Sequence, residues 1–455
     1  MKNISNKYTY IFSFFLLLGI TSCDDALDVD LPSNQLSSES VYSSETTAEA
    51  AVNGIYQSMV TDFYYNRVHS ILGQTADELV PTTGIANVYS SNEIPETDGT
   101  INTNWGELYK TIYNANNVIE GITKSTSLNA VKSRQWIAEA KFLRAYCYFY
   151  LTNLWGNVPL ILTTNVDVSA LSPQSSQQDV YAQILLDLTD ASKDLPTDYS
   201  NYDQERIRAT KWAAETLSAR VNLYLGRWTE AAAHATTVIN QTGIYKITDL
   251  GSVNSPFIAD NDESILQIPY YNVNYTYEGS SVFTTGGTFL LRKGNSLFET
   301  GDARKTNWTI DIRNRAGVFL GIAPYKYHNG FGNSPIERST VLRLAELYLI
   351  RAEARVRSND IIGAQQDINV IRNRALLDGT NLTDVNQLLD LIALERQREF
   401  FAENGHRWLD LKRTGKLDET LSVLSDKIWK TSDNLYPIPE PAIRSNPFLT
   451  QNLGY

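Results

Sequence analysis

The chain has 455 residues, of which 42% are hydrophobic and 20% are charged, and its formal net charge at pH 7 is −12. An acidic balance of this size argues against nucleic-acid binding, which requires a surface rich in lysine and arginine. The two cysteines are too few for a disulfide framework, whereas the length is sufficient for one large hydrophobic core or two.

Residues 1–22 have the pattern of a secretory signal peptide. Lys2 and Lys7 precede the apolar run IFSFFLLLGI at 11–20, which is too short to span a bilayer, and small residues follow it. The alternative is a buried N-terminal helix. The stretch ITSC resembles a bacterial lipobox, which implies cleavage before Cys23 and acylation of its thiol. Cleavage there would change the net charge to −14, because two lysines and no acidic residue are removed.

Residues 24–44 are polar and acidic with little periodicity, so we assign 23–44 to a lipidated tether that leads to the body. No later segment has the length and apolarity of a membrane span. From Glu45 onward a helical period dominates, and we predict helices over 45–60, 104–122, 133–156 and 178–195. Cys147, in the third of these helices, lies among aromatic residues and is predicted to be a buried, unreactive thiol.

Two later segments share an internal spacing of small residues. Ala219 precedes Ala231 by twelve positions, Ala352 precedes Ala364 by the same interval, and both segments have the pattern of helix, tight turn and helix. Twelve positions also separate the two small residues of a tetratricopeptide repeat, where they let antiparallel helices approach closely. We therefore predict a mainly α fold with two tetratricopeptide-like helix pairs, and the earlier helix pairs as degenerate ones.

Residues 242–337 differ in composition from the helices on both sides. Glycine, asparagine, serine, threonine and tyrosine become frequent, and the helical period disappears. Short strands are predicted at 263–270, 307–312, 317–322 and 324–328, the first of them half-buried because its side chains alternate. We expect an irregular subdomain of loops and short hairpins, inserted between an N-terminal helical part at 45–241 and a C-terminal helical part at 338–455.

Several motifs resemble the SusD/RagB family of outer-membrane lipoproteins. The strongest are VLRLAELYLIRAEA at 341–354, ERQREFFAENGHRWLDLKRTG at 395–415 and LYPIPEPAIRSNPFLTQNLGY at 435–455. Weaker matches are NLWGNVPL at 153–160 and GDAR at 301–304. The resemblance implies an α-rich body with tetratricopeptide-like helix pairs and an irregular subdomain that contacts the ligand.

The same resemblance implies a surface-exposed, nutrient-binding lipoprotein that captures oligosaccharide and delivers it to a TonB-dependent transporter of the outer membrane, the SusC-like partner. A peptide-binding, RagB-like uptake component is the alternative. A helical-repeat scaffold that binds only proteins remains open as a third class. The acidic residues after Cys23 agree with this assignment, because they are common in such surface lipoproteins.

Motifs for catalysis or metal binding are absent from the sequence. It contains no HExxH, CxxC, GxSxG, Walker or GxGxxG motif, and its four histidines are scattered. Acid pairs occur at 76–78 and 260–263, and paired carboxylates are what a glycosidase uses. Any chain with 51 acidic residues contains such pairs, so we predict no enzymatic activity, no metal and no cofactor.

The C-terminal motif contains a cluster of charges that could resemble a catalytic site. Glu395 and Glu399 lie four residues apart and share a helix face, with Arg396, Arg398 and Arg407 nearby. Arginine pairs with carboxylates in a planar, bidentate manner. We therefore predict that these residues form internal ion pairs that hold the last helices together.

Sugar binding requires aromatic rings for the C–H face of the ligand and polar groups for its hydroxyls, converging in a concave site. Loop segments at 62–67, 85–93, 270–278 and 305–310 interleave such residues. The candidate ligand contacts are Tyr64, Tyr65, Asn66, Arg67, Tyr89, Asn92, Tyr271, Tyr275, Tyr277 and Trp308. Trp308 could equally be a hairpin residue that packs inward. We expect the first three segments to converge on one face, opposite the tetratricopeptide-like pairs and directed into the partner barrel.

Overall fold

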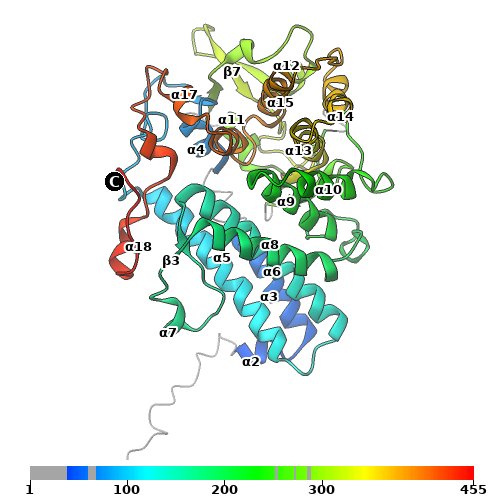
Figure 1. The fold of residues 1–455 in the computed structure, drawn as a ribbon, viewed down its shortest axis with the longest axis vertical. Helices are drawn as coiled ribbons and strands as arrows, with labels where there is room; N and C mark the ends of the chain where they lie inside the picture. Colours follow the sequence, from blue (N-terminus) through cyan, green and yellow to red (C-terminus); the bar gives the residue numbers. More distant parts are fainter. Residues whose placement is uncertain (1–37, 60–67, 252–254, 271–272, 284–287) are drawn as a thin grey trace, which may run out of the picture.

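The computed structural model describes residues 38–59, 68–251, 255–270, 273–283 and 288–455. The residues with a predicted function that lie outside these ranges are Cys23, Tyr64, Tyr65, Asn66, Arg67 and Tyr271. Figure 1 shows that helices run through the whole body and that the irregular segment with β7 and α12 occupies one end of it.

The N-terminal part of the chain is built mainly from helices. Its elements are α2 (Ser38–Val41), α3 (Glu45–Ser58), α4 (Val68–Thr75), β1 (Leu79–Pro81), α5 (Gly99–Lys124), α6 (Ala130–Trp155), β2 (Val158–Pro159), α7 (Val166–Ser169), β3 (Gln174–Ser175), α8 (Gln177–Asp194), η4 (Ser200–Tyr202), α9 (Lys211–Tyr224) and α10 (Trp228–Ile239). The four predicted helices are confirmed as α3, α5, α6 and α8. α5 begins five residues earlier than predicted because Asp98 caps it, accepting hydrogen bonds from the amides of Thr100 and Ile101 at 3.0 and 2.9 Å.

The last residues of the predicted tether belong to the folded body. Residues 38–41 form α2, and the buried Tyr42 donates a hydrogen bond from its hydroxyl to Asn117 Oδ1 of α5 at 2.5 Å. The Tyr42 ring lies so close to Gly121 that a Cβ there would be 2.1 Å from it. The tether prediction is therefore wrong for 38–44, because a single aromatic contact leaves no periodic signal in the sequence.

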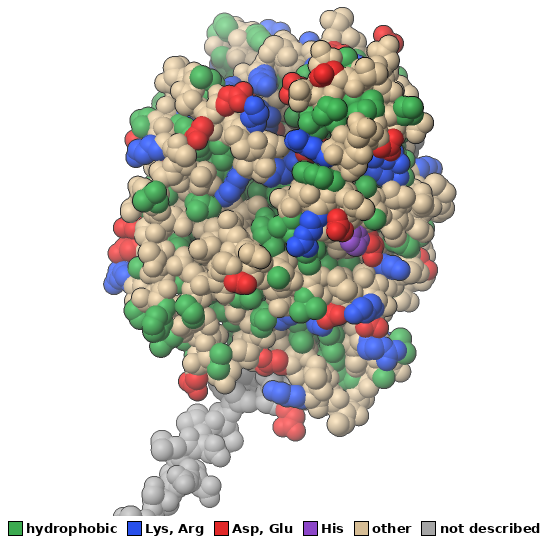
Figure 2. All heavy atoms as spheres, in the orientation of Figure 1, with side chains coloured by type: hydrophobic (Ala, Val, Ile, Leu, Met, Phe, Trp, Pro, Cys, Tyr) green, Lys and Arg blue, Asp and Glu red, His purple; other side chains and the backbone are tan. Residues whose placement is uncertain are grey.

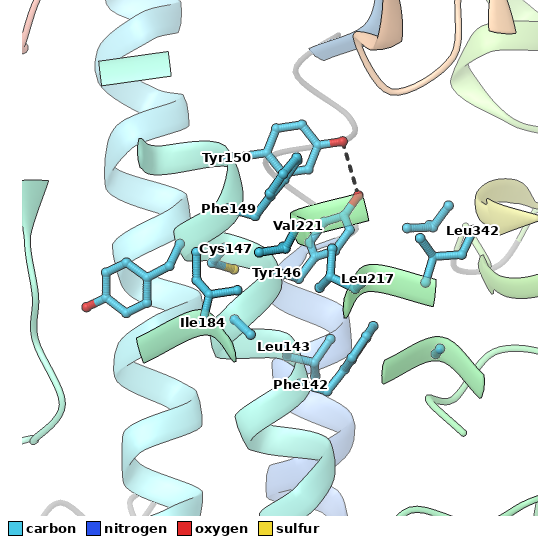
Figure 3. Packing of buried hydrophobic residues seen from close by; sticks show 14 of the residues in the cluster. Phe142, Leu143, Tyr146, Cys147, Phe149, Tyr150, Ile184, Leu217, Val221 and Leu342 are labelled. Carbon is cyan, nitrogen blue, oxygen red and sulfur yellow. Dashed lines mark hydrogen bonds between the residues drawn. The ribbon is translucent and has the colours of Figure 1, made fainter. Parts of the chain in front are cut away.

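α6 runs through the main hydrophobic core, part of which is drawn in Figure 3, and every residue of this helix from Phe142 to Trp155 is buried. Its side chains pack against those of α8, α9 and β8, and the hydroxyl of Tyr146 donates to that of Tyr150 at 3.3 Å. The predicted burial of Cys147 is confirmed, and burial raises the pKa of its thiol. Several tyrosines of this chain therefore belong to the hydrophobic core.

The two tetratricopeptide-like helix pairs are confirmed. The first consists of α9 and α10, and the second of α13 (Leu344–Arg357) and α14 (Ile361–Arg374). The four small residues at the twelve-residue spacing are all fully buried. α13 also packs on α10, so the two pairs lie against each other beside the irregular segment (Figure 1).

In its described residues the irregular segment contains short strands and, in addition, two short α-helices and one 3-10 helix. Its elements are β4 (Ser264–Ile268), α11 (Tyr277–Phe283), β5 (Phe289–Leu291), η5 (Gly294–Leu297), α12 (Ala303–Trp308), β6 (Thr309–Arg313) and β7 (Phe319–Pro324). Within the described residues the strands form two-stranded antiparallel sheets, β1 with β5, β2 with β3, β4 with β8 (Ser339–Arg343), and β6 with β7. β4 is buried along its whole length rather than half-buried as predicted, and of the strand predicted at 324–328 only Pro324 belongs to β7, while 325–328 form a loop.

The C-terminal part returns to helices, which an internal ion cluster joins to the irregular segment. The remaining elements are α15 (Val385–Phe400), α16 (His406–Arg413), α17 (Leu417–Leu421), η6 (Thr431–Asn434) and α18 (Glu440–Ser445). We define the ion cluster as Glu263, Glu299, Asp302, Arg304, Lys326, Arg343, Arg372, Arg374, Glu395, Arg398, Glu399 and Glu403. It contains six cationic and six anionic side chains, so a neutral and largely buried set of charges lies between the two parts, with Glu299 at its exposed edge.

The predicted ion pairs of the C-terminal motif are confirmed in this arrangement. Glu395 Oε2 lies 2.9 Å from Arg304 Nη2, and Glu399 Oε1 lies 2.6 Å from Arg343 Nη1. Outside the cluster, Arg396 Nε donates to Asp410 at 2.8 Å, and Arg407 Nε donates to Asp77 at 2.5 Å. These contacts tie α15 and α16 to α12, β8 and the turn that follows α4.

Candidate ligand-binding site

α4 is the element on which two segments of the predicted ligand face, 85–93 and 270–278, meet among the described residues. All eight of its residues are buried, and it begins directly after residues 60–67. The ring of His69, in its first turn, lies 5.9 Å from the ring of Tyr277 at the start of α11. The beginning of α4 and the segment 273–277 are therefore neighbours, although more than 200 residues separate them.

The loop 85–93 is attached to the other end of α4. Asn87 Nδ2 donates to Gln74 Oε1 at 2.7 Å, and Asn92 Nδ2 donates to Thr75 O at 3.0 Å. The buried ammonium of Lys427 lies between them and donates to Asn92 Oδ1 at 2.6 Å and to Gln74 O at 2.9 Å. The loop is thus held by hydrogen bonds from both sides.

Two of the predicted ligand contacts are corrected by the structure. Asn92 is only 5% exposed, and both its amide nitrogen and its oxygen are used within the fold, so it has a structural role. Trp308 is 0% exposed and packs on Phe257 and Phe401, which is the inward packing considered as the alternative. In both cases the side chain that the local sequence pattern predicted to contact a ligand instead contacts residues that are distant in the chain.

The three remaining candidates within the described residues are partly exposed. Tyr89 donates its hydroxyl to Asp98 Oδ1 at 2.9 Å and packs along the main core. Tyr275 contacts Phe331 edge-on, with ring centroids 5.6 Å apart. Tyr277 faces His69, as described above. Tyr275 and Tyr277 belong to one surface with α11, whereas Tyr89 lies toward α5.

Sequence reasoning missed Phe331, whose side chain is 61% exposed. It sits in a loop that Asn329 organises, because Asn329 Nδ2 contacts Asn274 O, Gly332 O and Pro335 O at 2.7 to 3.0 Å. An exposed aromatic ring on a loop tied by hydrogen bonds is well suited to stack on a ligand. The run HNGFGN at 328–333 has the same mixture of aromatic and amide residues as the loops that were selected.

A cavity of about 40 Å³ lies against α11 on this surface. Its lining includes His69 of α4, Glu278 of α11, Phe289 of β5 and Lys326, so four separate segments contribute to it. The loop 325–328 that supplies Lys326 follows β7, and β5 and α4 are linked through the pairing of β1 with β5. No local pattern could have indicated this convergence.

Carboxylates and one ammonium set the electrostatics around this cavity. Both oxygens of Glu278 lie 2.9 Å from the donating hydroxyl of Ser339. Glu337 accepts hydrogen bonds from the amides of His328 and Asn329, but burial outweighs them and, with the nearby charge of Glu278, raises its pKa to about 7. Burial lowers the pKa of Lys326 to about 8, and Glu403 partly offsets this effect.

Both family comparisons agree with this architecture of a helical scaffold that presents loops and short hairpins on one surface. Residues 25–223 match a SusD-like family model described as starch-binding and associating with the outer membrane, and residues 234–455 match the SusD family model. The chain belongs to the SusD/RagB family.

Its relatives are distant but similar over most of their length. SusD-like protein P25 of Formosa agariphila is 26% identical over 532 aligned positions, which cover 99% of each chain. The starch-binding protein SusD of Bacteroides thetaiotaomicron is 26% identical over 418 positions, which cover 70% of this chain and 72% of that protein.

Solved structures share the fold. A laminarin-binding SusD-like protein is 26% identical, has a TM-score of 0.74 and matches 91% of this chain and 100% of its own. A SusD superfamily protein from Parabacteroides distasonis has a TM-score of 0.78 at 22% identity, with 92% of this chain and 100% of that chain covered. Among the helices that the structure describes, none is both long and apolar enough to cross a membrane.

Proposed function

We propose that this protein is a surface-exposed, non-catalytic lipoprotein that captures oligosaccharide and passes it to a SusC-like, TonB-dependent transporter of the outer membrane. The observation that carries the proposal is the match to SusD family models along 25–455. Two relatives are named for starch binding and for laminarin binding, which favours a glycan over a peptide as the ligand.

The surface around α11 supports a sugar-binding role. Tyr275, Tyr277 and Phe331 present aromatic rings, and Glu278 presents a carboxylate that can accept hydrogen bonds from hydroxyl groups. Aromatic rings stack on the apolar face of a sugar ring, whereas polar groups bind its rim. We propose that Tyr64, Tyr65, Asn66, Arg67 and Tyr271 add further contacts to this surface.

The acid pairs that a glycosidase could use are engaged inside the fold, which supports a binding protein. Asp77 pairs with Arg407 at 2.5 Å, and Glu78 Oε2 accepts the amide of Ala402 at 3.0 Å. Asp260 Oδ1 lies 2.6 Å from Arg338 Nη1. Hydrolysis would require one carboxylate to act as an acid and another to act as a base or nucleophile beside the bound sugar.

Calorimetric titration with starch and laminarin oligosaccharides and with peptides tests the ligand class. The variant Tyr275→Ala/Phe331→Ala should bind the identified glycan several-fold to more than tenfold more weakly, because each stacked ring contributes about 0.5–1.5 kcal/mol. Tyr113→Ala, at an exposed tyrosine of α5, is the control and should bind like the wild type. Binding of peptides alone would favour the RagB-like role, and formation of shortened sugars would contradict a non-catalytic protein.

Metabolic labelling with a palmitate analogue tests the anchor. The wild type should be labelled and Cys23→Ala should not, because the lipobox-like ITSC assigns the acyl chains to that thiol. Equal labelling of both proteins would contradict anchoring at Cys23.

A further inference from the structure

The cavity against α11 has the size of one substituent of a sugar rather than of a sugar ring. Its volume is about 40 Å³, and a cavity needs about 10–15 Å³ to hold one water molecule, so this one holds only a few non-hydrogen atoms. A hydroxymethyl group, the exocyclic C6 of a hexose, therefore fits, while the ring itself would remain outside near Tyr277. In a glycuronan the same carbon is a carboxylate of similar size, so shape alone does not separate the two ligands.

Charge distinguishes a neutral hexose glycan from a glycuronan, because the carboxylate of Glu278 is held at the wall of this cavity. The Ser339 hydroxyl lies 2.9 Å from both of its carboxylate oxygens and fixes their position. Among the described residues no lysine or arginine forms an ion pair with Glu278.

Lys326, the cation that also lines the cavity, is already engaged from the protein side. Its ammonium donates to the Glu403 carboxylate and, at 2.7 Å, to Glu399 O. It also lies 4.0 Å from the ring centroid of Phe401 and 4.8 Å from that of Trp308. Lys326 belongs to the ion cluster, which is neutral as a whole, so among the described residues that line the cavity the carboxylate of Glu278 is the charge without an ion-pair partner.

On the basis of the proposed glycan-binding function, we propose that Glu278 makes the site selective for uncharged hexose glycans over glycuronans. A C6 hydroxyl can donate a hydrogen bond to the Glu278 carboxylate inside the cavity. A C6 carboxylate has no hydrogen to donate at neutral pH and is repelled by the like charge. Glu278 is thus a specificity-determining residue that distinguishes a C6 hydroxymethyl group from a C6 carboxylate.

A matched pair of ligands tests this inference. A laminarin oligosaccharide that binds in the screen above is oxidised at its C6 hydroxyls to the uronate, so that the glycosidic backbone stays the same and only the group at C6 changes from a neutral donor to an anion. The wild type should bind the oxidised form at least about tenfold more weakly than the neutral form, as expected when like charges face each other at close range. In Glu278→Gln the ratio of the two Kd values should fall to about threefold or less.

Glu419→Gln is the matched control, because it removes one negative charge from an exposed side chain of α17. It should keep the wild-type ratio, and thermal unfolding of both variants should match the wild type. An independent measurement needs no variant: the wild-type ratio should shrink as the ionic strength rises to about 0.5 M, because salt screens a partly exposed charge.

Three results would overturn the inference. These are equal binding of both oligosaccharides by the wild type, an unchanged ratio in Glu278→Gln, or a ratio independent of salt. Failure to bind any neutral oligosaccharide would overturn the proposed function together with the inference, whereas binding without selectivity would overturn the inference alone.

Discussion

Replacement of Arg343 by methionine should destabilise the protein more than any surface substitution. Arg343 is buried at the centre of the ion cluster. Its guanidinium lies 2.9 Å from Glu263, 2.6 Å from Glu399 and 2.8 Å from Glu403, and it donates to Glu399 O at 2.9 Å. The variant would leave three buried carboxylates with one cation fewer.

The magnitude follows from how far the remaining cations compensate. Removal of one partner from a buried ion pair costs about 3–5 kcal/mol. Glu263 keeps Arg374 at 3.0 Å, Glu399 keeps Arg304 and Arg374, and Glu403 keeps Lys326. We therefore expect a loss at the lower end of this range, about 3 kcal/mol, which is a large part of the 5–15 kcal/mol that stabilises a typical folded domain.

Urea unfolding monitored by tryptophan fluorescence measures this loss. Trp308 is a suitable reporter because its ring lies within 6.0 Å of the Arg343 guanidinium and 5.2 Å of that of Arg374. With a urea m-value of about 3 kcal/mol/M, the midpoint should fall by about 1 M. Lys132→Met, which breaks the exposed pair with Glu45, is the control and should leave the midpoint unchanged. A midpoint for Arg343→Met equal to that of the control would refute the argument.

Three further predictions follow from other parts of the fold. Burial alone would raise the pKa of Glu346, but Arg220 outweighs burial and lowers the pKa from 4.5 to about 2. The contribution of this carboxylate to stability is therefore present above pH 4.5 and is lost as the pH falls toward 2. Glu346→Gln should flatten the pH dependence of the free energy of unfolding in that window, as measured by circular dichroism. Gly405 has φ +70°, and a Cβ added there would lie only 2.1 Å from Leu72 Cδ1, so Gly405→Ala should lower the free energy of unfolding by about 2 kcal/mol or more. Gly415 has φ +66° but lies in open space, so Gly415→Ala should cost only about 1 kcal/mol in the same urea titration. Lys427→Met should speed hydrogen exchange of the amides of 85–93 in mass spectrometry, because the loop loses the ammonium that joins it to α4; unchanged exchange would show that the asparagine contacts suffice.

The helical part of this protein could be predicted from the sequence because helix formation depends on interactions within about four residues. Apolar spacing located α3, α5, α6 and α8, and the twelve-residue spacing of alanines identified both helix pairs. The roles of Glu395 and Glu399 were predictable for a similar reason, since two acids on one helix face among arginines favour ion pairs. Their partners on α12 and β8 were not, because those residues are distant in the chain.

Contacts between distant segments decided the rest. Alternation in β4 indicated a half-buried strand, but β8, whose residues follow about 75 positions later, pairs with it and both faces are covered. Asn92 and Trp308 are residue types that often contact ligands, but within the fold Asn92 binds Lys427 and Trp308 packs on Phe401. The cavity at Glu278 draws its lining from segments between residues 69 and 402. A side chain's exposure is set by which neighbours the whole fold brings to it, and for loop residues that information is not contained in the local sequence.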